Sequence, residues 1–253
     1  MGIKHADAGP TWESETDILA PVVSNSWQRS RGGKEHVRRH VARWHDGRVR
    51  LVKRALKGRR LPGAGLVLDV AGGDGFYSAL VASLTGGRLV VQDIGASGTR
   101  ESYAAGYRAV RGDIRRLPFA DGAADVTLAF EVLGYLDPSD APSVIEELHR
   151  VTKPGGILLL STPNRYSLES WKGLARYLVD GTVWNAGGTG SVTIYSRGAL
   201  VSLLRPHFSI EAWYGYSLAP PLRNLTTGWT YAVTANPLLA RLSHKLFVVA
   251  RRR

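Results

Sequence analysis

The stretch LVLDVAGGDGFYS, Leu66 to Ser78, places three glycines between a short apolar run and an amphipathic pattern. Residues 66–70 are almost entirely apolar, which is typical of a strand buried on both faces of a sheet. Apolar residues then recur at helical spacing from Tyr77 onward. Glycine loses more conformational entropy on folding than any other residue, so three glycines in four positions need a structural reason. They predict either positive φ angles or the close approach of a ligand. The segment predicts the nucleotide-binding corner of a doubly wound sheet. The alternative at this point is a tight βα turn that binds no ligand.

From this corner the chain continues as alternating strands and helices. The predicted strands are residues 66–70, 88–92, 107–110, 125–130 and 156–161, and the predicted helices are residues 76–84, 99–105 and 141–151. Such alternation is typical of parallel strands joined by right-handed crossovers. After a further helix near 196–204, a strand pair, residues 208–214 and 245–250, closes the chain.

Composition narrows the class of protein. The 253 residues contain no cysteine, which excludes disulfides, thiolate zinc sites and cysteine nucleophiles, and suits a reducing compartment. The N-terminus lacks the apolar core of a signal peptide, and no apolar run reaches transmembrane length. We therefore expect a cytoplasmic protein with no transmembrane segment and no bound metal.

Positive charge is concentrated in one stretch near the N-terminus. Residues 28–60 hold thirteen arginines and lysines against two acids, a net +11 of the chain's formal +12. Such a stretch can contact nucleic acid, an anionic membrane surface or an acidic substrate, or it can be a solvated helix face. Apolar residues recur at helical spacing from Val37 to Ala55. We therefore favour two amphipathic helices packed on the sheet with arginines outward over a dedicated RNA arm, and allow weak contact with an anionic membrane surface.

Four acidic residues, Asp69, Asp93, Asp113 and Glu131, end four successive predicted strands. Ligands of doubly wound sheets bind beyond the carboxyl ends of the strands. Asp93 lies 20 residues after Gly73, a spacing that suits hydrogen bonds from ribose hydroxyls to a carboxylate. The glycine segment lacks the Lys-Ser/Thr of a phosphate-binding loop. The pattern therefore predicts a nucleoside ligand without a phosphate chain.

In order and spacing, these motifs resemble those of class I S-adenosylmethionine-dependent methyltransferases, and the ubiquinone/menaquinone branch in particular. VLDVAGGDG at 67–75 is similar to the family's first motif, VVQDI at 90–94 to its second, and GDIRRLPFADGAADVTLAFEVLGYL at 112–136 to its third. ELHRVTKPGGILLLSTPNR at 147–165 resembles the helix, turn and fifth strand that follow. The resemblance covers about residues 66–165.

This resemblance implies a Rossmann-like, doubly wound α/β fold. Its seven-stranded sheet would be mostly parallel with an antiparallel C-terminal strand, accompanied by N-terminal helices and an inserted substrate cap. Residues 1–60 would form a basic helical lid. Residues 61–253 would form the methyltransferase domain, with cap insertions at about 164–195 and 215–244.

The resemblance also implies how S-adenosylmethionine, the expected cofactor, would be held. Asp69 and the small residues after it would cradle the methionine end. Asp93 would hold the ribose hydroxyls, with Ile94 against adenine. Asp113 would accept from the adenine amino group while Ile114 offers its backbone N–H. The predicted cofactor-binding residues are Asp69, Ala71, Gly72, Gly73, Gly75, Asp93, Ile94, Asp113, Ile114 and Phe130.

A general base is needed only where the methyl acceptor has a proton to lose. Family members often carry histidine in the segment after the fourth strand, where this chain has Tyr135, so a histidine base there cannot be carried over. The predicted catalytic residues are His45 and Tyr135. The alternative for His45 is a surface histidine, and for Tyr135 a half-buried aromatic whose hydroxyl is hydrogen-bonded. His149, in the helix before the Pro-Gly-Gly turn, is interpreted as structural.

The predicted function is methyl transfer to an O, N or C atom of a small aromatic or lipid-like metabolite, because residues 167–243 are rich in Trp and Tyr. The alternative is an RNA methyltransferase that uses the basic stretch. Against it, the chain has neither a cysteine nucleophile nor an Asn/Asp-Pro-Pro-Tyr segment after Phe130. A binding protein without catalysis is the third reading, and the intact acids Asp69, Asp93 and Asp113 argue against it. An exposed apolar insert could form a dimer surface, so both a monomer and a homodimer stay open.

Overall fold

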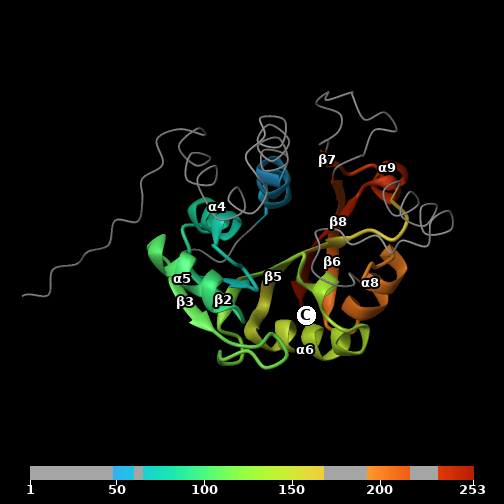
Figure 1. Cartoon of the computed structure of the whole chain (residues 1–253). Helices are drawn as coiled ribbons and strands as arrows, with labels where there is room; N and C mark the ends of the chain where they lie inside the picture. Colours follow the sequence, from blue (N-terminus) through green and yellow to red (C-terminus); the bar gives the residue numbers. More distant parts are fainter. Residues whose placement is uncertain (1–47, 60–64, 168–192, 217–232) are drawn as a thin grey trace, which may run out of the picture. The chain divides into compact units, whose positions relative to one another are not determined.

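Eight strands of the described chain form one sheet in the order β3-β2-β1-β4-β5-β8-β6-β7 (Figure 1). The computed structural model describes residues 48–59, 65–167, 193–216 and 233–253, which all fall in one unit, Asp46–Arg253. The strands are β1 (Leu66–Val70), β2 (Arg88–Asp93), β3 (Arg108–Arg111), β4 (Ala124–Phe130), β5 (Thr152–Pro163), β6 (Phe208–Tyr216), β7 (Val233–Thr234) and β8 (Lys245–Arg252).

Strands β1 to β5 are parallel, whereas β8 runs antiparallel between β5 and β6. The predicted mostly parallel, Rossmann-like sheet with an antiparallel C-terminal strand is confirmed. The two-residue β7 adds a short eighth strand at the edge. Chain order reverses between β1 and β4, which is the switch point where ligands of such sheets bind.

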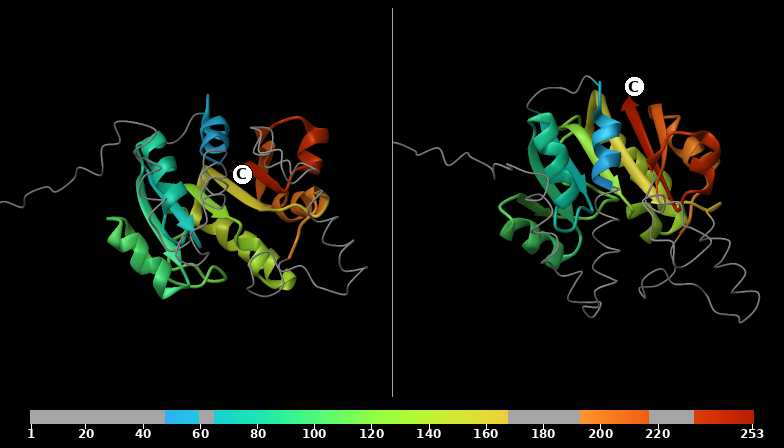
Figure 2. Two further views of the ribbon diagram at one scale, coloured as in Figure 1. Left: turned by 45° about the horizontal axis from the view of Figure 1, so that its top comes forward. Right: turned by 90° about the horizontal axis from the view of Figure 1, so that it is seen from above.

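Helices cover both faces of this sheet. They are α4 (Phe76–Thr85), α5 (Ala96–Ala104), α6 (Ala141–Val151), α8 (Arg197–Leu204) and α9 (Pro237–Leu242), with 3-10 turns η2 (Val132–Tyr135) and η3 (Pro138–Asp140) and the helical residues 48–56. Residues 48–56 and α4 lie on one side and α6 on the other (Figures 1 and 2). Within the described residues, none of the helices combines the length and apolar character that crossing a membrane requires.

The main core lies between the sheet and α6. Every third or fourth residue of this helix is apolar, and Ala141, Val144, Ile145, Leu148 and Val151 are all at most 1% exposed. They pack with buried residues of β1, β5 and β8 in one cluster. Full burial of a leucine or isoleucine side chain contributes roughly 1.5–3 kcal/mol, so this face holds α6 firmly on the sheet.

One predicted turn lies inside a strand. A turn at Pro154, Gly155 and Gly156 was expected to lead into a strand at residues 156–161, but β5 begins at Thr152, four residues earlier. Its pairing with β4 shifts register between Ala124 and Val126, and Gly155 has a φ of 74°. The strand can continue through the two glycines because its pairing is irregular there and because Gly155 adopts a left-handed conformation at little energetic cost.

The segment between β3 and β4 is tied to α6 by Arg150. Its guanidinium donates to the backbone oxygens of Leu117 and Phe119, at 3.0 and 2.8 Å, and pairs with Glu147. Glu147 in turn accepts from the backbone N–H of Leu117. These bonds position the residues that follow Asp113.

The predicted lid and caps fall mostly outside the described residues. This applies to residues 1–47 and 60–64 of the N-terminal region, and to 168–192 and 217–232 of the two insertions. Within the predicted lid, residues 48–59 belong to the same unit as the sheet.

Candidate active site

The carboxyl ends of the parallel strands bring the predicted acids to one edge of the sheet. Asp69 lies in β1 and Asp93 ends β2. Asp113 lies two residues after the end of β3, and Glu131 directly follows β4. Because these strands are adjacent in the order β3-β2-β1-β4, the acids line the switch-point edge as the sequence predicted.

The glycine turn combines left-handed backbone with close packing. Gly73 and Gly75 have φ angles of 57° and 76°, and Ala71 has a φ of 56° although it carries a Cβ. A Cβ on Gly72 would lie 2.3 Å from the Asp69 Oδ2, whereas a Cβ on Gly73 would meet no heavy atom within 4 Å. Positive φ, one of the two predicted reasons, applies to Gly73 and Gly75, whereas Gly72 is required by close packing against Asp69. The space beside Gly73 is open.

Asp93 connects this turn to the end of β2. Its Oδ2 accepts a hydrogen bond from the Gly73 N–H at 3.0 Å, and its Oδ1 accepts from the Gly95 N–H at 2.7 Å. The Ser102 hydroxyl donates to the Gly73 carbonyl at 2.6 Å. A carboxylate offers about four acceptor positions, so two remain for ligand hydroxyls while the turn stays fixed.

Asp69 is a buried acid beneath the turn. Only 3% of the residue is exposed, and its Oδ1 has no hydrogen-bond partner. Burial raises the pKa of Asp69 to about 7; a hydrogen bond with Ser78 opposes the shift, and the nearby Asp74 and Asp93 add to it. An unsatisfied buried acceptor at this position fits a site that gains a positively charged ligand group.

The predicted adenine side is apolar at its surface. Ile94 is 61% exposed at the end of β2, while Ile114 is buried. Asp113 pairs with Arg115 through hydrogen bonds of 2.6 to 3.1 Å, and these bonds lower the pKa of its carboxyl group. With the bond from the Arg115 backbone N–H, four hydrogen bonds fill the acceptor positions of the Asp113 carboxylate, so an adenine amino group would have to displace the exposed Arg115 side chain. The exposed Ile94 and the free acceptor positions of Asp93 fit a nucleoside.

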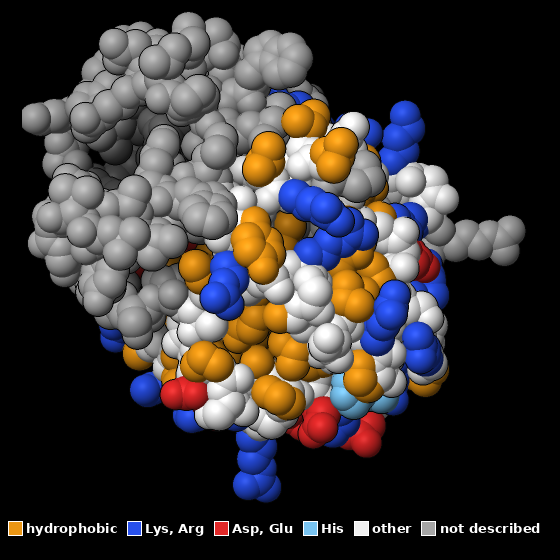
Figure 3. All heavy atoms as spheres, turned by 90° about the vertical axis from the view of Figure 1, so that its right-hand side faces the viewer, with side chains coloured by type: hydrophobic (Ala, Val, Ile, Leu, Met, Phe, Trp, Pro, Cys, Tyr) orange, Lys and Arg blue, Asp and Glu red, His pale blue; other side chains and the backbone are white. Residues whose placement is uncertain are grey.

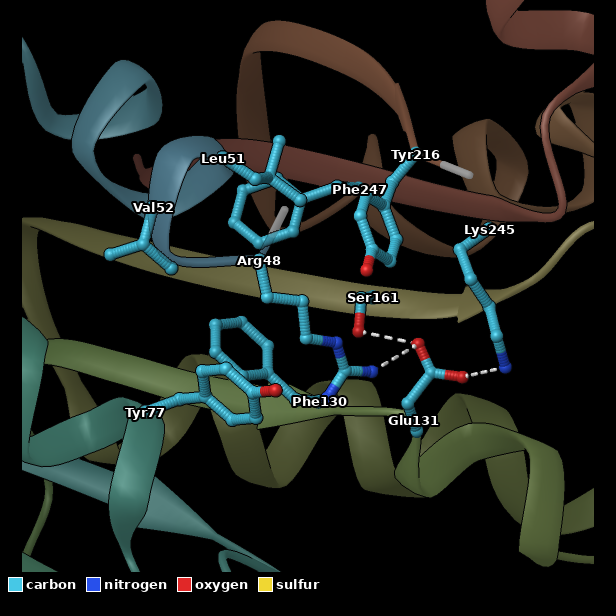
Figure 4. A pocket seen from close by; sticks show the side chains of 10 residues that line it. All are labelled: Arg48, Leu51, Val52, Tyr77, Phe130, Glu131, Ser161, Tyr216, Lys245 and Phe247. Atoms are coloured by element: carbon cyan, nitrogen blue, oxygen red, sulfur yellow. Dashed lines mark hydrogen bonds and ion pairs between the residues drawn. The ribbon is translucent and has the colours of Figure 1, made fainter. Parts of the chain in front are cut away.

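A small pocket lies beside the turn, at the ends of β4, β5, β6 and β8 (Figure 4). Glu131 is at its centre: its Oε1 accepts from the Ser161 hydroxyl at 2.8 Å and lies 3.1 Å from the Arg48 Nη2. Its Oε2 pairs with the Lys245 ammonium. Burial favours the neutral acid, but Lys245 and Arg48 outweigh it and lower the pKa of Glu131 to about 2. Glu131 is therefore ionised at neutral pH.

Arg48 reaches the pocket from the helical residues 48–56 and is 9% exposed. Its guanidinium carbon lies 4.9 Å from the centroid of the Tyr77 ring, within cation–π range. Burial lowers the pKa of Arg48, but Tyr77, Glu131 and Tyr216 together raise it by more, so the guanidinium stays charged. The prediction that the arginines of the basic stretch face outward is wrong for Arg48.

Aromatic side chains complete the wall of the pocket. The Phe130 ring lies 6.3 Å from Tyr77 and 5.6 Å from Phe247, and Tyr216 points into the pocket from β6. Burial, opposed by Arg48, raises the pKa of Tyr77, so its hydroxyl remains protonated at neutral pH. The predicted cofactor residue Phe130 thus borders both the glycine-turn side and the pocket.

Neither predicted catalytic residue is among the described residues that line the pocket. His45 is outside the described residues. Tyr135 ends η2 and is 64% exposed, and it is absent from the described residues that line the pocket. The rings of His149 and His207 lie 5.1 Å apart between their centroids, tilted by 48°. They lie near the amino ends of β5 and β6, at the opposite edge of the sheet, in line with the structural interpretation of His149.

Sequence reasoning did not select most of the residues that line the pocket. Arg48 was counted only within a charge run, and Lys245 and Ser161 only as strand residues. The one sequence signal for these residues was Glu131, an acid at the end of a predicted strand. A carboxylate that becomes buried there requires a cationic partner. Among the described residues, no group of His, Asp or Glu could hold a metal ion.

Comparisons with known proteins place a methyltransferase domain in this part of the chain. Residues 68–160 match the family model described as a methyltransferase domain. The chain is 40% identical over 106 residues to an uncharacterized methyltransferase of Mycobacterium sp. (strain JLS), covering 40% of this chain and 39% of that protein. It is 33% identical over 120 residues to the malonyl-[acyl-carrier protein] O-methyltransferase of Serratia marcescens, covering 44% of this chain and 46% of that protein.

The structural likeness extends further than the sequence match. A methyltransferase of Thermotoga maritima, described as a possible histamine N-methyltransferase, superposes with a TM-score of 0.62 at 16% identity. The match covers 85% of this chain and 95% of that one and shows a shared fold. The chain spans less than half the length of the curated relatives named above. Residues 68–160 thus match a methyltransferase domain, and the predicted resemblance of this part of the chain to class I S-adenosylmethionine-dependent methyltransferases is confirmed.

Proposed function

We propose that this protein transfers a methyl group from S-adenosylmethionine to an O, N or C atom of a small aromatic or lipid-like molecule. One observation carries the proposal: the glycine turn fixed by Asp93 lies beside a pocket walled by aromatic rings, at the switch point of the sheet. Tyr77, in the first turn of the helix that follows the glycine turn, and Phe130, the last residue of β4, both line the pocket.

On the cofactor side, each predicted residue has a defined task. Asp93 would hold the ribose hydroxyls with the acceptor positions that its backbone partners leave, and Gly73 offers the open backbone for close approach. Ile94 would cover the adenine ring and Asp113 would accept from its amino group. When bound, S-adenosylmethionine supplies an electrophilic methyl group on a positively charged sulfur.

On the acceptor side, the chain supplies alignment and exclusion of water. Methyl transfer is an in-line displacement, so positioning in an aromatic, partly buried pocket provides much of the rate. Glu131 is a poor base because its pKa is about 2. For an acceptor that must lose a proton, we retain His45 and Tyr135 as the proposed bases. Full kcat from pH 6 to 9 in both His45→Ala and Tyr135→Phe would exclude them.

A small acceptor is favoured over RNA by the contacts of the basic stretch. Arg48 pairs with Glu131 and Arg59 with Glu211, while Arg54 lies 5.9 Å from the centroid of the Tyr214 ring. These side chains serve intramolecular contacts. On the face drawn in Figure 3, Lys and Arg side chains are interspersed with apolar and uncharged groups.

The proposal is tested by methyl transfer from S-adenosylmethionine labelled in its methyl group. The full-length protein is incubated with quinols, phenolic acids, fatty acids and, separately, transcribed RNA. We expect label in one of the small-molecule classes and none after Asp93→Ala. Labelled RNA with unlabelled small molecules would replace the small-acceptor proposal with the RNA alternative.

A further inference from the structure

One arginine takes up the whole carboxylate of Asp113. The Arg115 backbone N–H donates to the Asp113 Oδ1 at 2.9 Å, and the Arg115 Nε lies 3.1 Å from both carboxylate oxygens. The Arg115 Nη2 donates to Oδ2 at 2.6 Å. A carboxylate offers about four acceptor positions, and these four hydrogen bonds use all of them. Another donor can therefore reach Asp113 only in place of the Arg115 side chain.

The Arg115 side chain can move without any change in the turn that carries it. This side chain is 52% exposed, and exposed ion pairs contribute little to stability. Other hydrogen bonds hold the backbone of the turn. The Arg116 N–H donates to the Asp113 carbonyl at 3.1 Å, and the Leu117 N–H donates to the Glu147 carboxylate at 2.8 Å. The guanidinium is thus the replaceable part of this arrangement.

A second carboxylate lies within reach of the same guanidinium. The Arg115 Nη1 lies 3.5 Å from the Oδ2 of Asp140, the last residue of η3. Asp140 also precedes α6 as its N-cap residue, but its side chain makes no capping hydrogen bond. Because a guanidinium presents several N–H donors, an Arg115 side chain that leaves Asp113 keeps Asp140 as a partner. Its charge is therefore not left unpaired.

Asp113 and Ile94 follow the ends of neighbouring strands. In the parallel pairing of β2 with β3, Asp93 lies opposite Arg111, so Ile94 comes one residue and Asp113 two residues after this pair. The Arg111 Nε donates to the Ile94 carbonyl at 3.1 Å and connects the two segments. The exposed apolar surface proposed for adenine and the carboxylate proposed for its amino group thus lie at the same corner of the sheet.

We propose that Arg115 competes with the adenine amino group for the Asp113 carboxylate, lowers the affinity for the cofactor, and moves to Asp140 when the nucleoside binds. This inference rests on the proposed function and adds a residue that sets cofactor affinity. The competition involves the amino group and not the charge of the sulfur. Arg115 therefore weakens the binding of S-adenosylmethionine and S-adenosylhomocysteine alike, and favours release of the product after methyl transfer.

The test compares S-adenosylhomocysteine with its analogue that carries hydrogen in place of the 6-amino group. Dissociation constants are measured by titration calorimetry on the full-length protein at pH 7.5 and fixed ionic strength. Arg115→Ala should bind S-adenosylhomocysteine about two- to fivefold more tightly, because no exposed ion pair has to be broken. Its affinity for the analogue, which has no amino group to place on Asp113, should be unchanged. Arg116→Ala removes the same charge from the next exposed residue and should leave both affinities unchanged.

Two further variants test the two carboxylates. Asp113→Asn removes the charged acceptor for which Arg115 competes, so adding Arg115→Ala to it should bring no gain in affinity. Asp140→Asn removes the second partner of the guanidinium. It should weaken the binding of S-adenosylhomocysteine about twofold when Arg115 is present, and have no effect in combination with Arg115→Ala. No effect of Asp140→Asn in either background would overturn the movement to Asp140.

The remaining outcomes separate this inference from the proposed function. Unchanged or weaker binding of S-adenosylhomocysteine by Arg115→Ala overturns the competition. An equal gain for the analogue also overturns it, because charge or space, and not the amino group, then accounts for the gain. In these cases the binding of S-adenosylhomocysteine leaves the proposed function standing. If the unmodified protein does not bind S-adenosylhomocysteine, the proposed function fails, and the competition at Asp113 fails with it.

Discussion

Replacing Gly73 with alanine separates the requirement for ligand space from the requirement for backbone freedom. Gly73 and Gly86 both have left-handed φ angles, 57° and 66°, and a Cβ on either would meet no heavy atom within 4 Å. Alanine at either position should therefore lower the free energy of unfolding by a similar amount, about 1–2 kcal/mol, from left-handed strain alone. Gly86 caps the far end of α4, so it is a matched control away from the site.

The two variants should differ in ligand binding. A methyl group pressed against a closely bound cofactor costs about 1–3 kcal/mol, which corresponds to a roughly 5- to 150-fold weaker affinity for S-adenosylhomocysteine in Gly73→Ala. Gly86→Ala should bind it as the unmodified protein does. Urea denaturation measures the stabilities and titration calorimetry the affinities. Equal affinities in Gly73→Ala and Gly86→Ala would refute the placement of the cofactor over Gly73.

Three further predictions concern the acids of the site. Asp93→Ala should weaken S-adenosylhomocysteine binding by at least about tenfold in calorimetry, because each lost charge-assisted hydrogen bond costs roughly 1.5–3 kcal/mol; unchanged affinity would remove Asp93 from the site. Glu131→Gln should lower the free energy of unfolding in urea by about 3 kcal/mol, since Arg48 and Lys245 lose their buried counter-charge; a loss below about 1 kcal/mol would contradict this. Because the pKa of Asp69 is raised from 3.8 to about 7, the folded state holds its proton more tightly than the unfolded state. Its contribution to stability should therefore fall as pH rises from about 4 to about 7, and Asp69→Asn should remove that fall in urea denaturation at pH 5 and 7.

The features that the sequence predicted well are local in the chain. The strand, glycine turn and helix from Leu66 onward are specified by residues that are close together in the sequence. The strand β1 was predicted at its observed bounds. The bounds of α6 also follow from its own apolar spacing. The position of Asp93 beside the glycine turn could be predicted because the carboxyl ends of parallel strands lie at the same edge of the sheet. Its role in binding the cofactor stays a prediction.

The features that were missed depend on contacts between distant segments. Glu131 and Lys245 are 114 residues apart, and the pairing of β5 with β8 brings them together. Arg48 was expected at the surface because the helical spacing places it on a polar face. The spacing does not show that a buried carboxylate elsewhere in the fold pairs with this arginine. The turn predicted at Gly155 and Gly156 failed for a related reason, because only the register with β4 shows that the strand has already begun.

A crystal structure of the full-length protein with S-adenosylhomocysteine tests the cofactor site most directly. We predict the ribose hydroxyls within hydrogen-bond distance of Asp93, the adenine ring against Ile94, and the sulfur beyond Gly73 on the side facing Phe130. Density for the ligand away from the carboxyl edge of the sheet, or no density at saturating concentration, would contradict the proposed site.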